Sequence, residues 1–259
     1  MTLEGFTESS LSHEGSTRTV YRRGAGPGVI IMHEIPGITP PVAAFARRVA
    51  DAGFTVVMPV LFGTPGKPVS APYAVGQLLR ACVSREFAVL AARQSSPVTD
   101  WLRALCRSVH AELGGKGVGA IGMCITGNFA LTLMVEPAVM APVLSQPSLP
   151  FPIGRERRAG LHISDSDLAV VKARVAQGAC VLGLRFTCDP LVPAERFEHL
   201  RAELGKGFEG IEIDTSRGNP HGIPWAAHSV VTNDLVDSEG HPTRVALDRV
   251  LSFFEERLR

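Results

Sequence analysis

Short apolar runs recur along the chain and constrain its fold more than any other feature. The runs GVIIMH at 28–33 and FTVVMP at 54–59 lack the polar–apolar alternation of a half-exposed strand. Strands buried on both faces have this pattern, and they belong to parallel sheets that are covered by helices on both sides. Further strands of this kind are predicted at 118–123, 139–144, 181–187 and 210–214.

Segments with helical spacing of apolar residues separate these runs. The segment 42–52 ends before Gly53, which suits a glycine at C′, and 99–113 begins with Thr99 or Asp100 as its N-cap. Alternating strands and helices predict an α/β protein with a mostly parallel central sheet, flanked by helices on both faces. The other predicted helices are 77–93, 125–135, 168–177, 193–204 and 243–258.

Length and charge narrow the function classes. A chain of 259 residues is ordinary for one α/β domain, so a single domain over 1–259 is predicted. The formal net charge of +1 and the lack of a basic run do not indicate binding to nucleic acid or to an anionic membrane. The stretch 118–135 is uncharged, but three glycines and an asparagine interrupt it, so a buried strand, turn and helix are predicted rather than a membrane span.

Cysteine usage and the N-terminus both point to a cytoplasmic protein. The five cysteines form no CxxC pair and are odd in number, which suits reduced thiols rather than a disulfide framework or a zinc site. The N-terminal stretch MTLEGFTESSLSHEG lacks the apolar core of a signal peptide. We therefore expect a cytoplasmic monomer or small homo-oligomer.

The segment VGAIGMCITGNFALTLMV has the strand–Gly-x-nucleophile–helix form of a nucleophile elbow, with Cys124 in the place of the usual serine. A tight turn lifts the sulfur above the sheet edge, and Gly122 and Gly127 avoid backbone clashes beside it. Amides at the start of the next helix favour a thiolate and a developing oxyanion. Thr126 stands where the general motif has glycine, so the turn must be relieved differently. The alternative for Cys124 alone is an inert, buried thiol.

A cysteine nucleophile needs a base, and the base needs an orienting acid. Asp189 ends the strand 181–187 and opens the loop CDPLVPAERF, so its carboxylate is expected at the same sheet edge as Cys124. His228 follows the next strand, which completes the order nucleophile, acid, histidine that α/β-hydrolases use. His221 in GNPHG is the competing histidine. His33, Glu34 and Cys124 can also be taken as a metal site, but no ligand spacing supports one, and neither metal nor cofactor is expected.

Four segments together resemble the dienelactone hydrolase family of α/β-hydrolases across nearly the whole chain. They are HEIPGI at 33–38, GMCITG at 122–127, DPLVP at 189–193 and HSV at 228–230. The resemblance implies that Cys124 is the nucleophile, that His228 is the general base and acid, and that Asp189 orients His228. It implies that Glu34 lies near the thiol and takes part in its activation. The backbone amides of Ile35 and Ile125 are the implied oxyanion hole.

The resemblance to the family is weaker among the residues that are expected to bind the substrate. Family members that open dienelactone hold its carboxylate with two arginines; Arg85 matches one, and Thr232 stands where the other is expected. The family's type lactone is therefore not the expected substrate. The segments 145–154 and 215–228 are distinctive loops at the ligand edge. We expect a larger, more apolar pocket lined by Gln146, Phe151, His221 and Trp225.

The sequence predicts a hydrolase that attacks the carbonyl of an ester, lactone or thioester through Cys124. Because the intermediate would be a thioester, an acyltransferase, a cyclase or a thioesterase is an alternative. A ligand-binding descendant of the fold without catalysis, with Cys124 and His228 too far apart for a relay, is another. A structural or interaction protein, without a pocket at the sheet edge, is the third.

Overall fold

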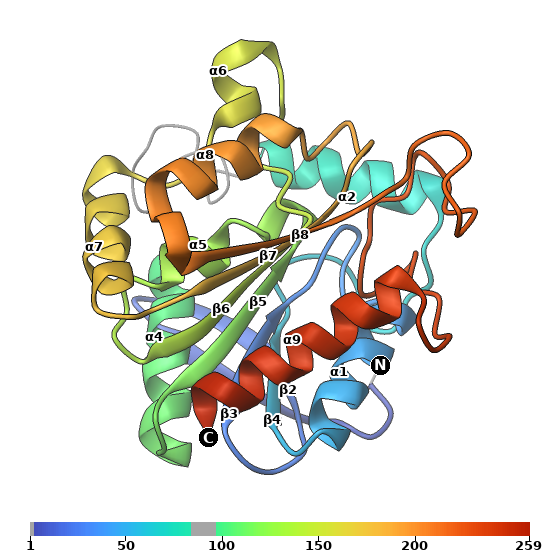
Figure 1. Cartoon of the computed structure of the whole chain (residues 1–259). Coiled ribbons are helices and arrows are strands. Elements are labelled where there is room, and N and C mark those ends of the chain that lie inside the picture. The colour runs from blue at the N-terminus through green and yellow to red at the C-terminus, as the bar shows by residue number, and fades with distance from the viewer. Residues whose placement is uncertain (1–2, 84–96) are drawn as a thin grey trace.

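One mixed sheet forms the centre of the molecule, whose computed structural model describes residues 3–83 and 97–259. Its eight strands lie in the order β1-β2-β4-β3-β5-β6-β7-β8 (Figure 1). Strands β3 to β8 are parallel, whereas β1 pairs antiparallel with β2, and β2 with β4. The strands are β1 (Thr7–His13), β2 (Ser16–Arg23), β3 (Gly28–Met32), β4 (Thr55–Pro59), β5 (Val118–Met123), β6 (Val139–Ser145), β7 (Val181–Phe186) and β8 (Phe208–Ile213).

The six strands expected from apolar runs are the six parallel strands, so the predicted α/β architecture is confirmed. The hairpin β1–β2 was not predicted. Most residues of β1 are polar and exposed, so the strand contributes little to the core and carries no apolar run. It extends the sheet through backbone hydrogen bonds to β2, which leave no mark in residue type.

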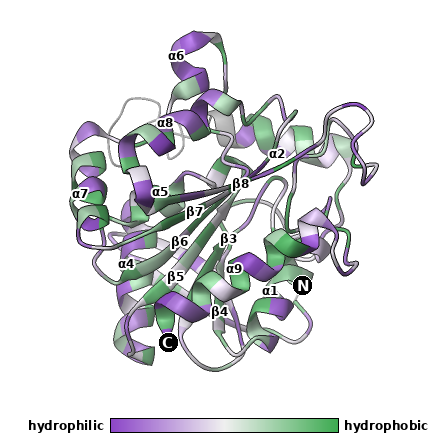
Figure 2. Ribbon diagram, viewed as in Figure 1, coloured by the Kyte–Doolittle hydropathy of each residue, from purple (hydrophilic) through white to green (hydrophobic). Residues whose placement is uncertain are grey.

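Successive side chains of β3 point into two separate hydrophobic cores. Val29 and Ile31 pack with α1 (Pro40–Asp51) and α9 (Pro242–Leu258) on one face of the sheet. Ile30 and Met32 pack on the other face, with α4 (Pro97–Leu113), α5 (Phe129–Leu133) and α8 (Ala194–Leu204). Figure 2 shows the green, hydrophobic strands between helices that carry purple, hydrophilic patches. The continuous apolar runs therefore follow from burial on both faces.

The helix predicted over 125–135 is wrong in length. The structure has a 3₁₀ turn (Cys124–Thr126) and then α5, which is only five residues long. Gly127 donates its N–H to the Cys124 carbonyl at 2.9 Å, a bond of the tighter 3₁₀ type, and the Asn128 side chain bonds the distant carbonyl of Leu161. Gly and Asn are poor helix formers, and here they separate the turn from the helix.

The remaining helices follow the predictions with shifts of a few residues. Helix α2 begins six residues before the predicted helix 77–93, whose last residues lie outside the described part of the chain. The short helix α6 was not predicted. No helix in the described residues combines the length and the apolar character needed to cross a bilayer. The helices whose bounds have not yet been given are α2 (Ala71–Val83), α6 (Gly154–Ala159) and α7 (Asp165–Ala176).

Candidate active site

Cys124 lies on a sharp turn directly after β5. Its φ is +56°, in the left-handed region that residues with a side chain seldom adopt. The turn has no room for neighbouring side chains: a Cβ at Gly122 would lie 2.0 Å from the Thr126 carbonyl oxygen, and one at Gly127 would lie 2.5 Å from the Pro147 Cα. Strain of this kind persists only where the surroundings hold it, and it occurs at the nucleophile elbow of α/β-hydrolases.

The side chain of Thr126 explains how the turn tolerates a residue other than glycine. Its buried hydroxyl accepts the N–H of Met123 at 2.9 Å and lies 2.9 Å from the Met32 carbonyl at the end of β3. Thr126 thereby ties the elbow to the neighbouring strand, which a glycine cannot do. Thr126 therefore stabilises the turn that carries Cys124.

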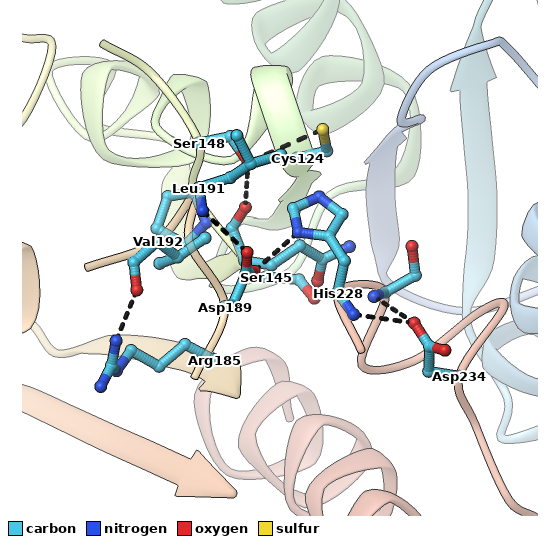
Figure 3. Close-up of polar contacts among 12 residues, drawn as sticks. Cys124, Ser145, Ser148, Arg185, Asp189, Leu191, Val192, His228 and Asp234 are labelled. Carbon is cyan, nitrogen blue, oxygen red and sulfur yellow. Dashed lines mark hydrogen bonds and ion pairs between the residues drawn. The ribbon is translucent and has the colours of Figure 1, made fainter. Parts of the chain in front are cut away.

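Asp189 and His228 meet at the same edge of the sheet as Cys124. The Nδ1 atom of His228 lies 2.6 Å from Oδ2 of Asp189, whose other oxygen accepts the N–H of Leu191 at 2.9 Å. Asp189 is 3% exposed. An acceptor on Nδ1 places the ring proton there and leaves Nε2 free to accept a proton. Figure 3 shows Nε2 facing toward the sulfur of Cys124.

The environment of His228 favours its charged form. Burial, the largest influence, lowers the pKa of His228, but Cys124 and Asp189 oppose it and together raise that pKa well above the usual 6.5. The Nε2 atom is buried, and apart from the interaction with Cys124 that contributes to this pKa, no partner within the described residues satisfies it. A buried polar atom without a partner is costly, and such atoms are often functional. The atom is thus poised to exchange a proton with the group that it faces.

Two residues that hold this arrangement were not found from the sequence. Asp234 accepts the backbone N–H groups of His228 and Ser229, at 2.9 and 2.8 Å, and so fixes the turn that carries the imidazole. Ser148, fully buried in the loop after β6, has its hydroxyl oxygen 3.7 Å from the Cys124 sulfur. Neither belongs to a motif. The only clue in the sequence is that Asp234 lies six residues after His228, and this spacing alone is too weak to predict the contact.

Glu34 follows β3 and is almost fully buried. Its carboxylate accepts hydrogen bonds from Ser229 at 2.7 Å and from Gln146 at 3.1 Å. Thr232 and Asn233 also donate to it, the latter at 3.2 Å. Thr232, at the position where carboxylate-binding members of the family have an arginine, therefore contributes a hydroxyl to Glu34. This carboxylate joins the loops after β3, β6 and β8 through neutral donors.

The backbone amides of Ile35 and Ile125 follow the ends of β3 and β5. No loop, turn or cap hydrogen bond in the described part of the chain uses either amide. Amides that are free of backbone partners and lie after adjacent strands suit an oxyanion hole. The assignment of these two amides stays a prediction.

The residues expected around the substrate differ in their surroundings. Gln146 is fully buried, and its amide bonds both Ser145 and Glu34. Trp225 is 66% exposed and lines a surface pocket of about 490 Å³ together with residues 215–219, Gly222 and Ile223. The exposed ring of His221 lies 5.5 Å from the ring of His241. Arg85 lies outside the described residues, so its role stays a prediction.

His33 has a structural environment. Its Nε2 accepts the N–H of Leu61 at 3.1 Å, so Nδ1 carries the proton, 3.2 Å from the carbonyl oxygen of Glu34. Burial lowers the pKa of His33 to about 4, which keeps it neutral. Across residues 3–83 and 97–259, no His, Cys, Asp and Glu side chains gather in a group that can hold a metal ion.

Comparison with known proteins is consistent with this geometry. Residues 17–258 match the model of the dienelactone hydrolase family. A yeast protein (Saccharomyces cerevisiae) named "Putative carboxymethylenebutenolidase" is 26% identical over 200 residues, which cover 74% of this chain and 69% of the yeast protein. The match to the family model thus covers nearly the whole chain, including all the strands that carry the site.

Solved structures share the fold. A crystal structure of a "Putative Dienelactone Hydrolase" from Klebsiella pneumoniae superposes with a TM-score of 0.65 at 19% identity, covering 97% of this chain and 98% of that one. The dienelactone hydrolase-like promiscuous phosphotriesterase P91, from metagenomic libraries, has the same TM-score at 18% identity and covers 98% of both chains. At these identities the likeness shows the α/β-hydrolase fold alone.

Proposed function

Because this chain belongs to the dienelactone hydrolase family, we propose that it hydrolyses an ester or lactone through Cys124 as the nucleophile. His228 is the general base and acid, and Asp189 orients its imidazole. The backbone amides of Ile35 and Ile125 stabilise the oxyanion. Besides these groups the chemistry needs only water, and no cofactor or metal.

The reaction proceeds through a covalent thioester. His228 Nε2 takes the thiol proton, or as imidazolium stabilises a thiolate already formed, and the Cys124 sulfur attacks the carbonyl carbon to form a tetrahedral oxyanion. Collapse breaks the bond to the alcohol oxygen, which receives the proton from His228 and leaves. A water molecule then gives a proton to His228 and attacks the thioester, and the acid is released as the thiol recovers its proton.

One observation carries the proposal: within the described residues, Nε2 of His228 has no partner other than Cys124. The nitrogen is buried and faces the Cys124 sulfur, while Nδ1 of the same ring is held 2.6 Å from Asp189. A non-catalytic descendant of the fold has no need to keep such an atom unsatisfied. The positive φ at Cys124 supports the same proposal, because backbone strain of this kind occurs mainly at functional sites.

Glu34 connects two loops of the proposed active site. The family resemblance implies that Glu34 takes part in activating the thiol. The hydrogen bonds of Glu34 to Gln146 and Ser229 indicate a second, structural role. Ser229 follows His228 directly, and Ile35 follows Glu34, so the carboxylate links the loop of the base to the loop of one oxyanion amide. We propose that Glu34 keeps these two loops in register.

The acyl intermediate is the decisive species to detect. Mixing the enzyme with p-nitrophenyl acetate should release a burst of about one p-nitrophenolate per chain, because acylation by a good leaving group outruns deacylation. Peptide mass spectrometry of the acid-quenched protein should locate the acetyl group on Cys124.

The same experiment separates the alternatives. Acetyl groups spread over all five cysteines, or a release of p-nitrophenolate without any burst or acylated thiol, would contradict the proposal. If an added alcohol or thiol captures the acyl group faster than water does, the enzyme is an acyltransferase that uses the same intermediate.

The substrate is expected to be uncharged near the scissile bond. Thr232 supplies a hydroxyl to Glu34 where carboxylate-binding relatives are expected to have an arginine. A hydrogen bond between charged groups contributes about 1.5–3 kcal/mol, which corresponds to roughly 10- to 100-fold in affinity. The kcat/KM for a lactone bearing a carboxylate should therefore be at least about tenfold below that for its methyl ester, with the difference in KM. Equal values for the pair would show that another cation replaces the missing arginine.

A further inference from the structure

Ser148 is a buried hydroxyl placed against the nucleophile. Its oxygen lies 3.7 Å from the Cys124 sulfur and 3.0 Å from the carbonyl oxygen of Gln146. Its backbone N–H donates to the Cys124 carbonyl at 3.0 Å. Ser148 therefore contacts the elbow both through its main chain and through its side chain (Figure 3).

The hydroxyl has one proton and two acceptors. A serine hydroxyl can donate only one strong hydrogen bond at a time. While the sulfur is neutral, the Gln146 carbonyl is the better acceptor and the closer one. When the sulfur becomes a thiolate, its charge makes it the stronger acceptor, since hydrogen bonds to ionised groups are roughly twice as strong as neutral ones. The proton can thus switch acceptors as the charge on sulfur changes.

We propose that Ser148 is a further catalytic residue, which donates a hydrogen bond to the Cys124 thiolate, and that Arg196 is the positioning residue that holds it there. The proposal rests on the proposed role of Cys124 as nucleophile. The bond favours the thiolate before acylation and again when the thioester breaks. It is released during the acyl-enzyme stage, when the sulfur is neutral.

Arg196 is fully buried and holds the loop of Ser148 by its carbonyl groups. Its guanidinium donates to the carbonyls of Pro147 at 2.5 Å and Pro150 at 2.6 Å, which flank Ser148. The same group donates to Leu191 at 3.4 Å, in the turn that carries Asp189. It also donates to the carbonyls of Arg157 and Gly160 at the end of α6.

Burial lowers the pKa of Arg196 to about 10, so the guanidinium stays charged at neutral pH. The negative charge of Asp189 acts against this lowering and favours the charged guanidinium. A rigid, planar fork with five N–H donors suits this task, because it can bind several carbonyls in fixed directions. One buried cation thereby connects the loop beside the nucleophile with the turn of the orienting acid.

The test is the pH profile of Cys124 alkylation by iodoacetamide, followed by peptide mass spectrometry. For Ser148→Ala, the midpoint of the profile should move up by about one pH unit. The alkylation rate at a pH below that midpoint should fall about tenfold, and the plateau at high pH should be kept. Ser145→Ala is the matched control, because the hydroxyl of this buried neighbour bonds Gln146 and no sulfur; its midpoint should stay that of the wild type.

The role of Arg196 has its own control in Arg174. Arg174 also binds carbonyls with its guanidinium, those of Met134, Glu136, Pro137 and Val139, but at the opposite end of β6. Lysine substitution at either position should lower the Tm, whereas only Arg196→Lys should move the alkylation midpoint upward. Adding Ser148→Ala to Arg196→Lys should then shift the midpoint by less than the sum of the single shifts.

The outcomes separate the two proposals. A wild-type Cys124 that alkylates no faster than the other cysteines would contradict its role as nucleophile. A reactive Cys124 whose midpoint is the same in wild type and Ser148→Ala would overturn the role of Ser148 alone. A shift of equal size in Arg174→Lys and Arg196→Lys would show that the effect on Cys124 is one of general stability.

Discussion

Replacing Cys124 by alanine should reduce kcat/KM for p-nitrophenyl acetate by on the order of 10⁴-fold or more, with little change in the free energy of unfolding. The nucleophile and its base act as a unit, so loss of either one removes nearly all of the covalent route. The side chain is 8% exposed and alanine fills most of its volume. Initial rates and chemical denaturation of the same preparation measure the two quantities.

Cys180→Ala is the matched control for this variant. Cys180 is a half-buried thiol that immediately precedes β7, at the end of the strand away from Asp189. Its replacement should leave kcat/KM within about twofold of the wild type. Cys106 is a poor competitor for the role, because burial raises the pKa of its thiol to about 12 and keeps it neutral. Retained esterase activity in Cys124→Ala would refute the nucleophile assignment.

Asp189→Asn should lower kcat/KM by about 10³- to 10⁴-fold while the protein stays folded. The asparagine amide can donate a hydrogen bond to Nδ1 of His228, in place of the bond at 2.6 Å that Asp189 accepts. The ring proton then lies on Nε2, which faces Cys124 and must accept the thiol proton. The imidazole is held in place, but in the wrong tautomer for a base.

The pH dependence should change as well. Cys124 and Asp189 raise the pKa of His228, against the lowering by burial, so the imidazolium of the wild type persists well above pH 6.5. An alkyl ester needs that proton for its leaving alcohol, so its turnover should fall as pH rises through the raised pKa. Without the Asp189 carboxylate, this falling limb should move to lower pH. A p-nitrophenyl ester, whose leaving group needs no proton, should show no such limb.

Asp237→Asn provides the control for this second variant. Asp237 bonds Arg48 and Arg244 at the surface, where ion pairs contribute little. The same chemical change there should leave both kcat/KM and the pH profile at wild-type values. If Asp189→Asn keeps the wild-type falling limb for alkyl esters, the role of Asp189 in setting the proton affinity of His228 is wrong.

Several features could be predicted because they leave a direct mark in residue type. Strands β3 to β7 are buried on both faces of the sheet, and burial requires runs such as VIIM and FTVV. The elbow at Cys124 is visible because Gly122 and Gly127 stand where the backbone packs too closely for a Cβ. Residue type alone was enough at these places, because a strand buried on both faces requires apolar residues and only glycine fits where a Cβ has no room.

Other features left no such mark. The strand β1 is exposed and polar, and the break of the helix after Cys124 depends on a side-chain bond from Asn128 to Leu161, a residue 33 positions away. The hydroxyl of Thr232 reaches Glu34 across 198 positions of sequence. The position of Thr232 after His228 marked an absent arginine, but what the threonine does instead could not be inferred from it.

For the elbow that carries Cys124, sequence by itself determined the order along the chain of the proposed nucleophile, acid and histidine, each after the end of a strand. Parallel strands bring those ends to one edge of the sheet, whatever the loops do. Only the tertiary structure decided which side chains meet there. It paired Asp189 with His228 and packed His221 edge to face against His241, and it placed Ser148 beside the sulfur. The physical reason is that a hydrogen bond depends on distances of tenths of an ångström, and the paths of long loops set those distances.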